Sequence, residues 1–195
     1  MTTSFPPHFA SALPALLPHP FTGQPYSLHR ADQLPAAPAR AREIAAVCNE
    51  PLVYDRLFRA RRQGQPYAAE EAQAFLDWAA AGWQEGTHFV FLLLDADHHV
   101  AGALDIKSAD LNSAEIGYWL GGAHRGIMTS ALNTLIDAAQ GAGFQRLWAR
   151  PDADNTRSVA LLERAGFTPY CPLDDLPNTA YFERLLEDSG RSSSR

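Results

Sequence analysis

A Gly-rich segment between a strand pattern and a helix pattern constrains the fold of this chain more than any other feature. Residues 114–120 (AEIGYWL) indicate a strand, and the loop 121–126 (GGAHRG) follows it directly. An apolar stripe at helical spacing then begins at Met128, and Gly141 ends it. The first N–H groups of a helix lack internal partners, and glycines let a ligand come close to the backbone. This unit therefore predicts an anion site suited to a pyrophosphate.

The spacing within the loop excludes two common nucleotide sites. The loop lacks the Gly-Lys-Ser/Thr ending of a P-loop. It is also not a GxGxxG fingerprint, and no acidic residue ends a following strand at the required distance. Nucleoside triphosphates and dinucleotides are therefore disfavoured as ligands.

The remaining patterns alternate between strand and helix periods. Strands are expected at 26–30, 88–94, 100–106, 146–150, 167–170 and 179–186, and helices at 39–48, 70–84 and 155–165. The later half needs a parallel crossover, whereas the hairpin over 88–106 is antiparallel. The sequence therefore predicts an α/β protein with a mixed sheet and helices on its faces.

Length and composition indicate one globular domain. The chain has 195 residues, of which 46% are hydrophobic, and we expect a Pro/Ala-rich extension over 1–25, a domain over 26–187 and a flexible tail over 188–195. Its net charge is −6 with no basic run, so a nucleic-acid partner is not expected.

Neither a metal nor a membrane is expected from the sequence. The two cysteines, Cys48 and Cys171, form no ligand spacing, and the adjacent His98 and His99 would point to opposite faces of a strand. Prolines interrupt the N-terminal apolar stretch, which carries no early Lys or Arg, and no apolar run is long enough to span a bilayer. We expect a cytoplasmic protein, either a monomer or a homodimer.

Several segments together resemble a known family. They are 115–120 (EIGYWL), 125–129 (RGIMT), 155–158 (NTRS) and 161–167 (LLERAGF). They look like the GNAT superfamily of N-acetyltransferases, and more narrowly its RimJ/RimL branch, which includes ribosomal-protein-alanine acetyltransferases. The resemblance covers residues 26–187.

The resemblance implies a fold, a co-substrate and a reaction. The fold is a mixed, mostly antiparallel sheet with a splayed parallel strand pair that holds acetyl-CoA in the wedge. The acetyl group passes to a primary amine, of a protein N-terminus or a small molecule, by direct attack in a ternary complex. The implied cofactor-binding residues are Trp119, Leu120, His124, Arg125, Gly126, Ile127, Met128, Thr129, Asn155 and Ser158.

The loop departs from the family pattern Gln/Arg-x-x-Gly-x-Gly/Ala. Ala123 stands at the Gln/Arg place and Met128 at the Gly/Ala place, and the loop is shorter than usual. A shorter loop offers fewer amides to a pyrophosphate. An alternative therefore stays open: a non-catalytic module that binds an acyl-CoA or a protein.

Three side chains are candidates for the chemistry. Glu115 is the candidate base and also an acceptor-binding residue, or else a solvated strand carboxylate. Ser158 is the candidate acid, by analogy with the branch, or else a helix-capping hydroxyl. Tyr118 is a candidate for the acceptor pocket, although an aromatic residue in a central strand also suits the core.

Overall fold

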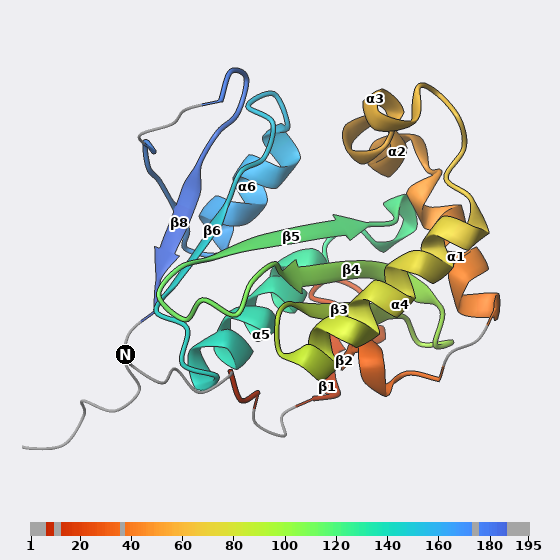
Figure 1. The fold of residues 1–195 in the computed structure, drawn as a ribbon, viewed down its shortest axis with the longest axis horizontal. Coiled ribbons are helices and arrows are strands. Elements are labelled where there is room, and N and C mark those ends of the chain that lie inside the picture. Colours follow the sequence, from red (N-terminus) through yellow and green to blue (C-terminus); the bar gives the residue numbers. More distant parts are fainter. Residues whose placement is uncertain (1–6, 10–12, 36–37, 173–175, 187–195) are drawn as a thin grey trace, which may run out of the picture.

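An eight-stranded sheet organises the molecule (Figure 1). The computed structural model describes residues 7–9, 13–35, 38–172 and 176–186. The expected tail over 188–195 lies outside these residues, as do residues 1–6 and 10–12 of the expected extension. The strands lie in the order β1-β2-β3-β4-β5-β6-β8-β7.

Only one neighbouring pair of strands in this sheet is parallel, namely β5 with β6. This confirms the mixed, mostly antiparallel sheet with one parallel pair. The strands are β1 (Ala15–Pro18), β2 (Pro25–Arg30), β3 (Phe89–Leu94), β4 (Val100–Ile106), β5 (Ala114–Leu120), β6 (Arg146–Ala149), β7 (Thr168–Pro169) and β8 (Phe182–Leu185).

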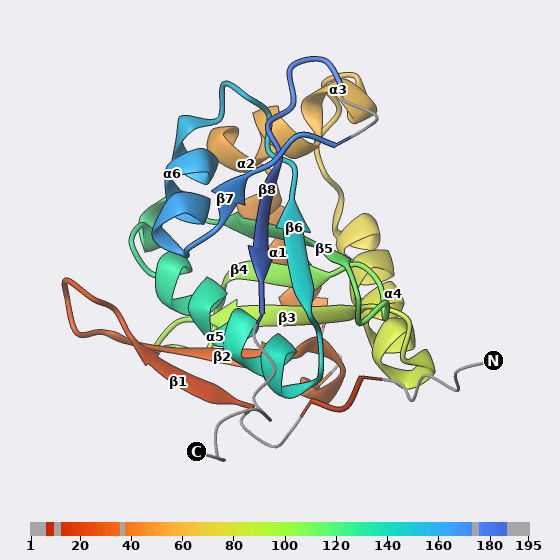
Figure 2. The same ribbon diagram turned by 90° about the vertical axis from the view of Figure 1, so that its left-hand side faces the viewer.

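Helices cover both faces of the sheet, as Figure 2 shows. On one face lie α1 (Pro38–Cys48) and α4 (Ala69–Glu85), and on the other lie α5 (Met128–Gly141) and α6 (Thr156–Arg164). Two short helices, α2 (Pro51–Leu57) and α3 (Arg59–Arg62), follow α1. Short 3₁₀ turns occur at Ala31–Gln33 and Gly122–His124.

The sequence FVFLLL makes β3 the centre of both cores. All six of its residues are buried. Phe89, Phe91 and Leu93 pack in the cluster beneath α5 and α6, whereas the alternate residues pack in the cluster beneath α1 and α4. A strand buried on both faces loses its polar/apolar alternation, which explains the continuous apolar run.

The structure adds three elements that the sequence did not predict. β1 lies within the stretch expected to be an extension, and it pairs with β2 at the edge of the sheet. Its Leu16 is exposed, so the strand has no clean alternating pattern. The helices α2 and α3 are too short for an amphipathic stripe, and the only local signal for them is Pro51 at the start of α2.

Three side chains in the turn before β4 could together hold a metal ion. Asp95, Asp97 and His99 offer ligand atoms within 4.8 Å of one another. Asp95 Oδ1 accepts the backbone N–H groups of Asp97 and His99, so this carboxylate holds the turn. Among the described residues, no helix combines the length and apolar character that crossing a bilayer requires.

Asp105 is an unusual polar residue within β4. Its partner across the sheet is Gly117 of β5, and a Cβ at Gly117 would lie 2.6 Å from Asp105 Oδ1. This oxygen is covered and has no hydrogen-bond partner among the described residues. Burial raises the pKa of the Asp105 carboxyl, and the charge of Lys107 and the Gly117 backbone only partly oppose it. The ionised carboxylate therefore destabilises the fold.

We predict that Asp105→Asn raises the free energy of unfolding at pH 7 by about 1 kcal/mol, because it removes a poorly satisfied charge at constant shape. A raised folded-state pKa means that the folded state binds the proton more tightly, so wild-type stability falls as pH rises above the ordinary Asp value of 3.8. The gain should therefore vanish below that pH.

Urea denaturation at neutral and acidic pH measures this effect. Asp137→Asn, on the exposed side of α5, is the matched control and should change stability little at either pH. A less stable Asp105→Asn protein at pH 7 would contradict the prediction.

Candidate active site

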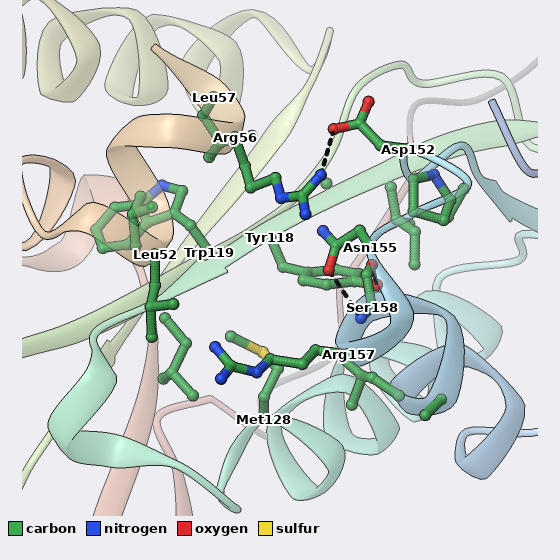
Figure 3. Close-up of a pocket in the computed structure, with 18 of the residues that line it drawn as sticks. Leu52, Arg56, Leu57, Tyr118, Trp119, Met128, Asp152, Asn155, Arg157 and Ser158 are labelled. Carbon is green, nitrogen blue, oxygen red and sulfur yellow. Dashed lines mark hydrogen bonds and ion pairs between the residues drawn. The ribbon is translucent and has the colours of Figure 1, made fainter. Parts of the chain in front are cut away.

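A cleft of about 640 Å³ opens where β5 and β6 diverge (Figure 3). The two strands pair only at Ala114 with Leu147 and at Glu115 with Trp148. Beyond Glu115, residues 116–120 of β5 pair with β4 alone. The end of β5, the loop 121–126, the start of α5, the segment from β6 to α6 and the helix α2 supply the lining.

The lining is positively charged although the chain is acidic. Six cationic side chains line the cleft against two carboxylates. The cations are Arg56, Lys107, Arg125, Arg150, Arg157 and Arg164, and the acids are Glu115 and Asp152. This excess suits an anionic ligand.

The loop between β5 and α5 is held from outside the cleft. Glu50 Oε2 accepts the Gly122 N–H at 2.5 Å. The hydroxyl of Tyr26 and Nδ1 of His124 lie 2.9 Å apart. Gly126 has a φ of 106°, which suits glycine, and it leads through Ile127 into α5.

The loop amides differ in their availability. The His124 N–H donates to Gly121 O at 3.1 Å, and the Ile127 N–H lies 3.5 Å from His124 O. For the N–H groups of Gly126 and Met128, by contrast, the described part of the chain supplies no acceptor. These two amides, at the positive end of α5, can therefore donate hydrogen bonds to an anion.

A pair of hydroxyls lies in the lining of the cleft. The Tyr118 hydroxyl lies 2.5 Å from Ser158 Oγ. Burial raises the pKa of Tyr118 to about 12, and the hydrogen bond with Ser158 opposes this only partly. Asn155 begins α6 and its Oδ1 accepts the Ser158 N–H at 3.3 Å. Asn155 is thus the cap, and the Ser158 hydroxyl is directed at Tyr118 instead.

Glu115 lies between two cations. Its Oε1 accepts from Lys107 Nζ at 2.5 Å and from Arg150 Nε at 3.1 Å. The side chain is only 14% exposed, so these ion pairs fix its position better than surface pairs would. Both cations bind the same oxygen, and Oε2 has no partner among the described residues.

The cleft brings together most of the residues predicted from the sequence. Glu115, Tyr118, Trp119, Leu120, Arg125, Gly126, Met128, Thr129, Asn155 and Ser158 all line it. His124 and Ile127 do not, because the His124 ring bonds Tyr26 and Ile127 is fully buried.

The sequence analysis missed the contribution of α2. Arg56 points from this helix toward Asp152, at 3.6 Å (Figure 3). It also contacts Asp154 at 2.5 Å. Leu52 and Leu57 of the same helix are partly exposed and add apolar surface to the lining of the cleft. Pro51 as a helix start was the only sequence signal for this element.

Comparison with known proteins places this arrangement in a family. Residues 34–168 match the model of the acetyltransferase (GNAT) domain. No curated protein matches the chain.

Solved structures share the fold at low sequence identity. RimL, a ribosomal L7/L12 α-N-protein acetyltransferase in complex with coenzyme A, has a TM-score of 0.68 at 18% identity, with 89% of this chain and 99% of that chain covered. The microcin C7 self-immunity acetyltransferase MccE, in complex with acetyl-CoA and AMP, has a TM-score of 0.65 at 20% identity, covering 82% and 92%. The spermidine N-acetyltransferase from Vibrio cholerae, in complex with CoA and spermine, has a TM-score of 0.63 at 16% identity, covering 83% and 95%.

The family match spans more than half of the chain, and its position agrees with the splayed strands and the cleft between them. The sheet, with its single parallel pair, has the architecture of the matched structures. The chain therefore belongs to the GNAT family of acetyl-CoA-dependent N-acetyltransferases.

Proposed function

We propose that the protein transfers the acetyl group of acetyl-CoA to a primary amine, by direct attack of the amine on the thioester in a ternary complex. The observation that carries the proposal is the wedge between β5 and β6, which joins a helix start that can bind an anion to a half-buried pair of hydroxyls. Either a protein N-terminus or a small-molecule amine is a suitable acceptor. RimL and the spermidine enzyme support these two classes respectively.

The residues of the cleft fit an extended anionic thioester. Trp119 and Leu120 lie on the part of β5 that does not pair with β6. Their backbone groups can therefore form hydrogen bonds with the amides of the pantetheine arm. The N–H groups of Gly126 and Met128, together with Arg125, suit the pyrophosphate. Acetyl-CoA supplies an activated acyl group, and the protein supplies its orientation.

Glu115 is the proposed proton acceptor for the attacking amine. Alternation along β5 places Glu115 and Tyr118 on opposite faces of the strand. Both nevertheless line the cleft, because the gap beside β6 opens to both faces of the sheet. Lys107 and Arg150 hold Oε1, which leaves Oε2 to take the amine proton directly or through a water.

Ser158 and Tyr118 are the proposed proton donors to the leaving thiolate. The sulfur gains negative charge as its bond to the acetyl carbon breaks, and a hydroxyl within reach can protonate it. With a pKa of about 12, Tyr118 remains protonated throughout the physiological range, so the pair keeps its proton at working pH.

The first prediction of this proposed function concerns co-substrate binding. Calorimetric titration with acetyl-CoA, and with desulfo-CoA as the unreactive analogue, should give a dissociation constant in the micromolar range, about −8 kcal/mol. Binding without acetyl transfer to any of a broad panel of amines would support the non-catalytic alternative. No heat and no thermal shift at millimolar ligand would refute the co-substrate assignment.

The second prediction concerns the base. Glu115→Gln keeps the shape of the side chain but removes its capacity to accept a proton, so kcat should fall about 100-fold. The Kd for desulfo-CoA should stay near the wild-type value. Thiol release measures the rate, and Glu163→Gln on the exposed side of α6 is the control. An unchanged rate in Glu115→Gln would remove Glu115 from the mechanism.

The third prediction concerns the acid. Ser158→Ala and Tyr118→Phe should each lower kcat at least about 10-fold, and the double variant should cost little more, because the two hydroxyls act as one unit. Wild-type activity should show no loss from Tyr118 ionisation up to pH 9, since its pKa is about 12. Tyr170→Phe, at a residue that does not line the cleft, is the control. Independent, fully multiplicative losses would argue against a shared proton path.

A further inference from the structure

His19 is a buried polar residue in an otherwise exposed turn. It lies between β1 and β2, in a connection whose residues 20–25 are exposed, yet only 7% of its own surface is accessible. The backbone of His19 closes the turn, donating its N–H to Gln24 O at 2.8 Å and accepting from the Gly23 N–H at 2.9 Å. The side chain points away from this turn, toward the loop that precedes α5.

The hydrogen bonds of the ring fix its tautomer. Nδ1 accepts the backbone N–H groups of Phe21 at 3.3 Å and Thr22 at 3.2 Å, so it carries no proton. Nε2 lies 2.9 Å from Arg125 O, and a carbonyl can only accept. The proton of the neutral ring is therefore on Nε2, which donates to Arg125 O.

The hairpin contacts the loop at three consecutive residues. Besides the bond from His19 to Arg125, Tyr26 of β2 bonds the ring of His124. Gly126 lies directly against the turn, because a Cβ there would come within 3.1 Å of the His19 ring and 3.2 Å of Phe21.

The bond to Arg125 O determines the direction of a neighbouring amide. The carbonyl of Arg125 and the N–H of Gly126 belong to one planar trans peptide unit, in which they point in opposite directions. Since His19 holds the carbonyl on the hairpin side, the Gly126 N–H is directed away from the hairpin. Gly126 lines the cleft, and its N–H has no acceptor within the described residues.

We propose that His19 is a positioning residue for co-substrate binding, which orients the Arg125–Gly126 peptide so that the Gly126 N–H faces the pyrophosphate of acetyl-CoA. The inference rests on the proposed function. Glycine allows this peptide to rotate at little steric cost, so an external contact is needed to hold one orientation. The loop is short, and its Gly122 N–H donates to Glu50 rather than to a ligand. The β1–β2 hairpin thereby compensates for the small number of loop amides that can reach the pyrophosphate.

Two substitutions separate the two roles of the ring. In His19→Asn, the side-chain oxygen can still accept from the turn N–H groups, as Asx residues do, but the side chain is too short to reach Arg125. In His19→Gln, the terminal amide can extend as far as Nε2 and donate to Arg125 O. His98→Asn is the matched control, since His98 is an exposed turn residue with a φ of 62°, which Asn accepts.

The test compares a ligand that carries the pyrophosphate with one that ends at the pantetheine arm and so lacks both the pyrophosphate and the phosphoadenosine. Desulfo-CoA is the first of these ligands, and S-acetylpantetheine is the second. We expect His19→Asn to weaken desulfo-CoA binding about 5- to 10-fold, the effect of one lost hydrogen bond, with S-acetylpantetheine binding unchanged. His19→Gln should recover most of the desulfo-CoA affinity, and His98→Asn should match the wild type for both ligands.

The outcomes distinguish this inference from the proposed function. Failure of the wild type to bind desulfo-CoA would overturn both. Wild-type binding that His19→Asn leaves unaltered, or an equal loss for both ligands, would overturn only the role of His19. If His19→Asn does not fold, His19→Gln and Tyr26→Phe decide the question. The inference would be refuted if Tyr26→Phe binds desulfo-CoA as the wild type does while His19→Gln loses affinity for both ligands.

Discussion

The divergence of β5 from β6 is the constraint on which the remaining structure depends. The parallel pairing ends after Glu115, although β5 continues to Leu120 beside β4. A sheet that stayed paired would fill this space with backbone hydrogen bonds and leave no cleft. The gap exposes a strand edge, admits groups from both faces of the sheet and points toward the start of α5, where backbone N–H groups lack partners.

Contacts from distant parts of the chain hold the walls of this gap. Glu50 fixes Gly122, Tyr26 fixes His124, and His19 fixes the carbonyl of Arg125. The loop is therefore preorganised before any ligand binds, which lowers the ordering cost of binding. One polar atom of the scaffold stays unsatisfied: Asp105 Oδ1 is buried without a hydrogen-bond partner among the described residues, and Asp105 pairs with Gly117, which lines the cleft.

Sequence reasoning worked where the pattern was long or the motif was contiguous. The stripe of α5 has a clear period and the apolar run of β3 is continuous. The predicted site residues over 115–129 and 155–158 lie in two short segments, and most of them line one cleft; their roles stay a prediction. It failed for β1, whose exposed Leu16 breaks the alternation at an open edge, and for α2, which has only seven residues. Short elements take their conformation from tertiary contacts more than from local preference.

The sequence by itself determined the order of the longer elements, the Gly-rich entry into α5 and the capped entry into α6, because each depends on residues that are neighbours along the chain. Only the tertiary structure decided which side chains meet in the cleft. Arg56 and Asp154 are separated by 98 positions, and His19 and Arg125 by 106. Such pairs leave no periodic signal in one sequence, since their proximity follows from the packing of the sheet and its helices.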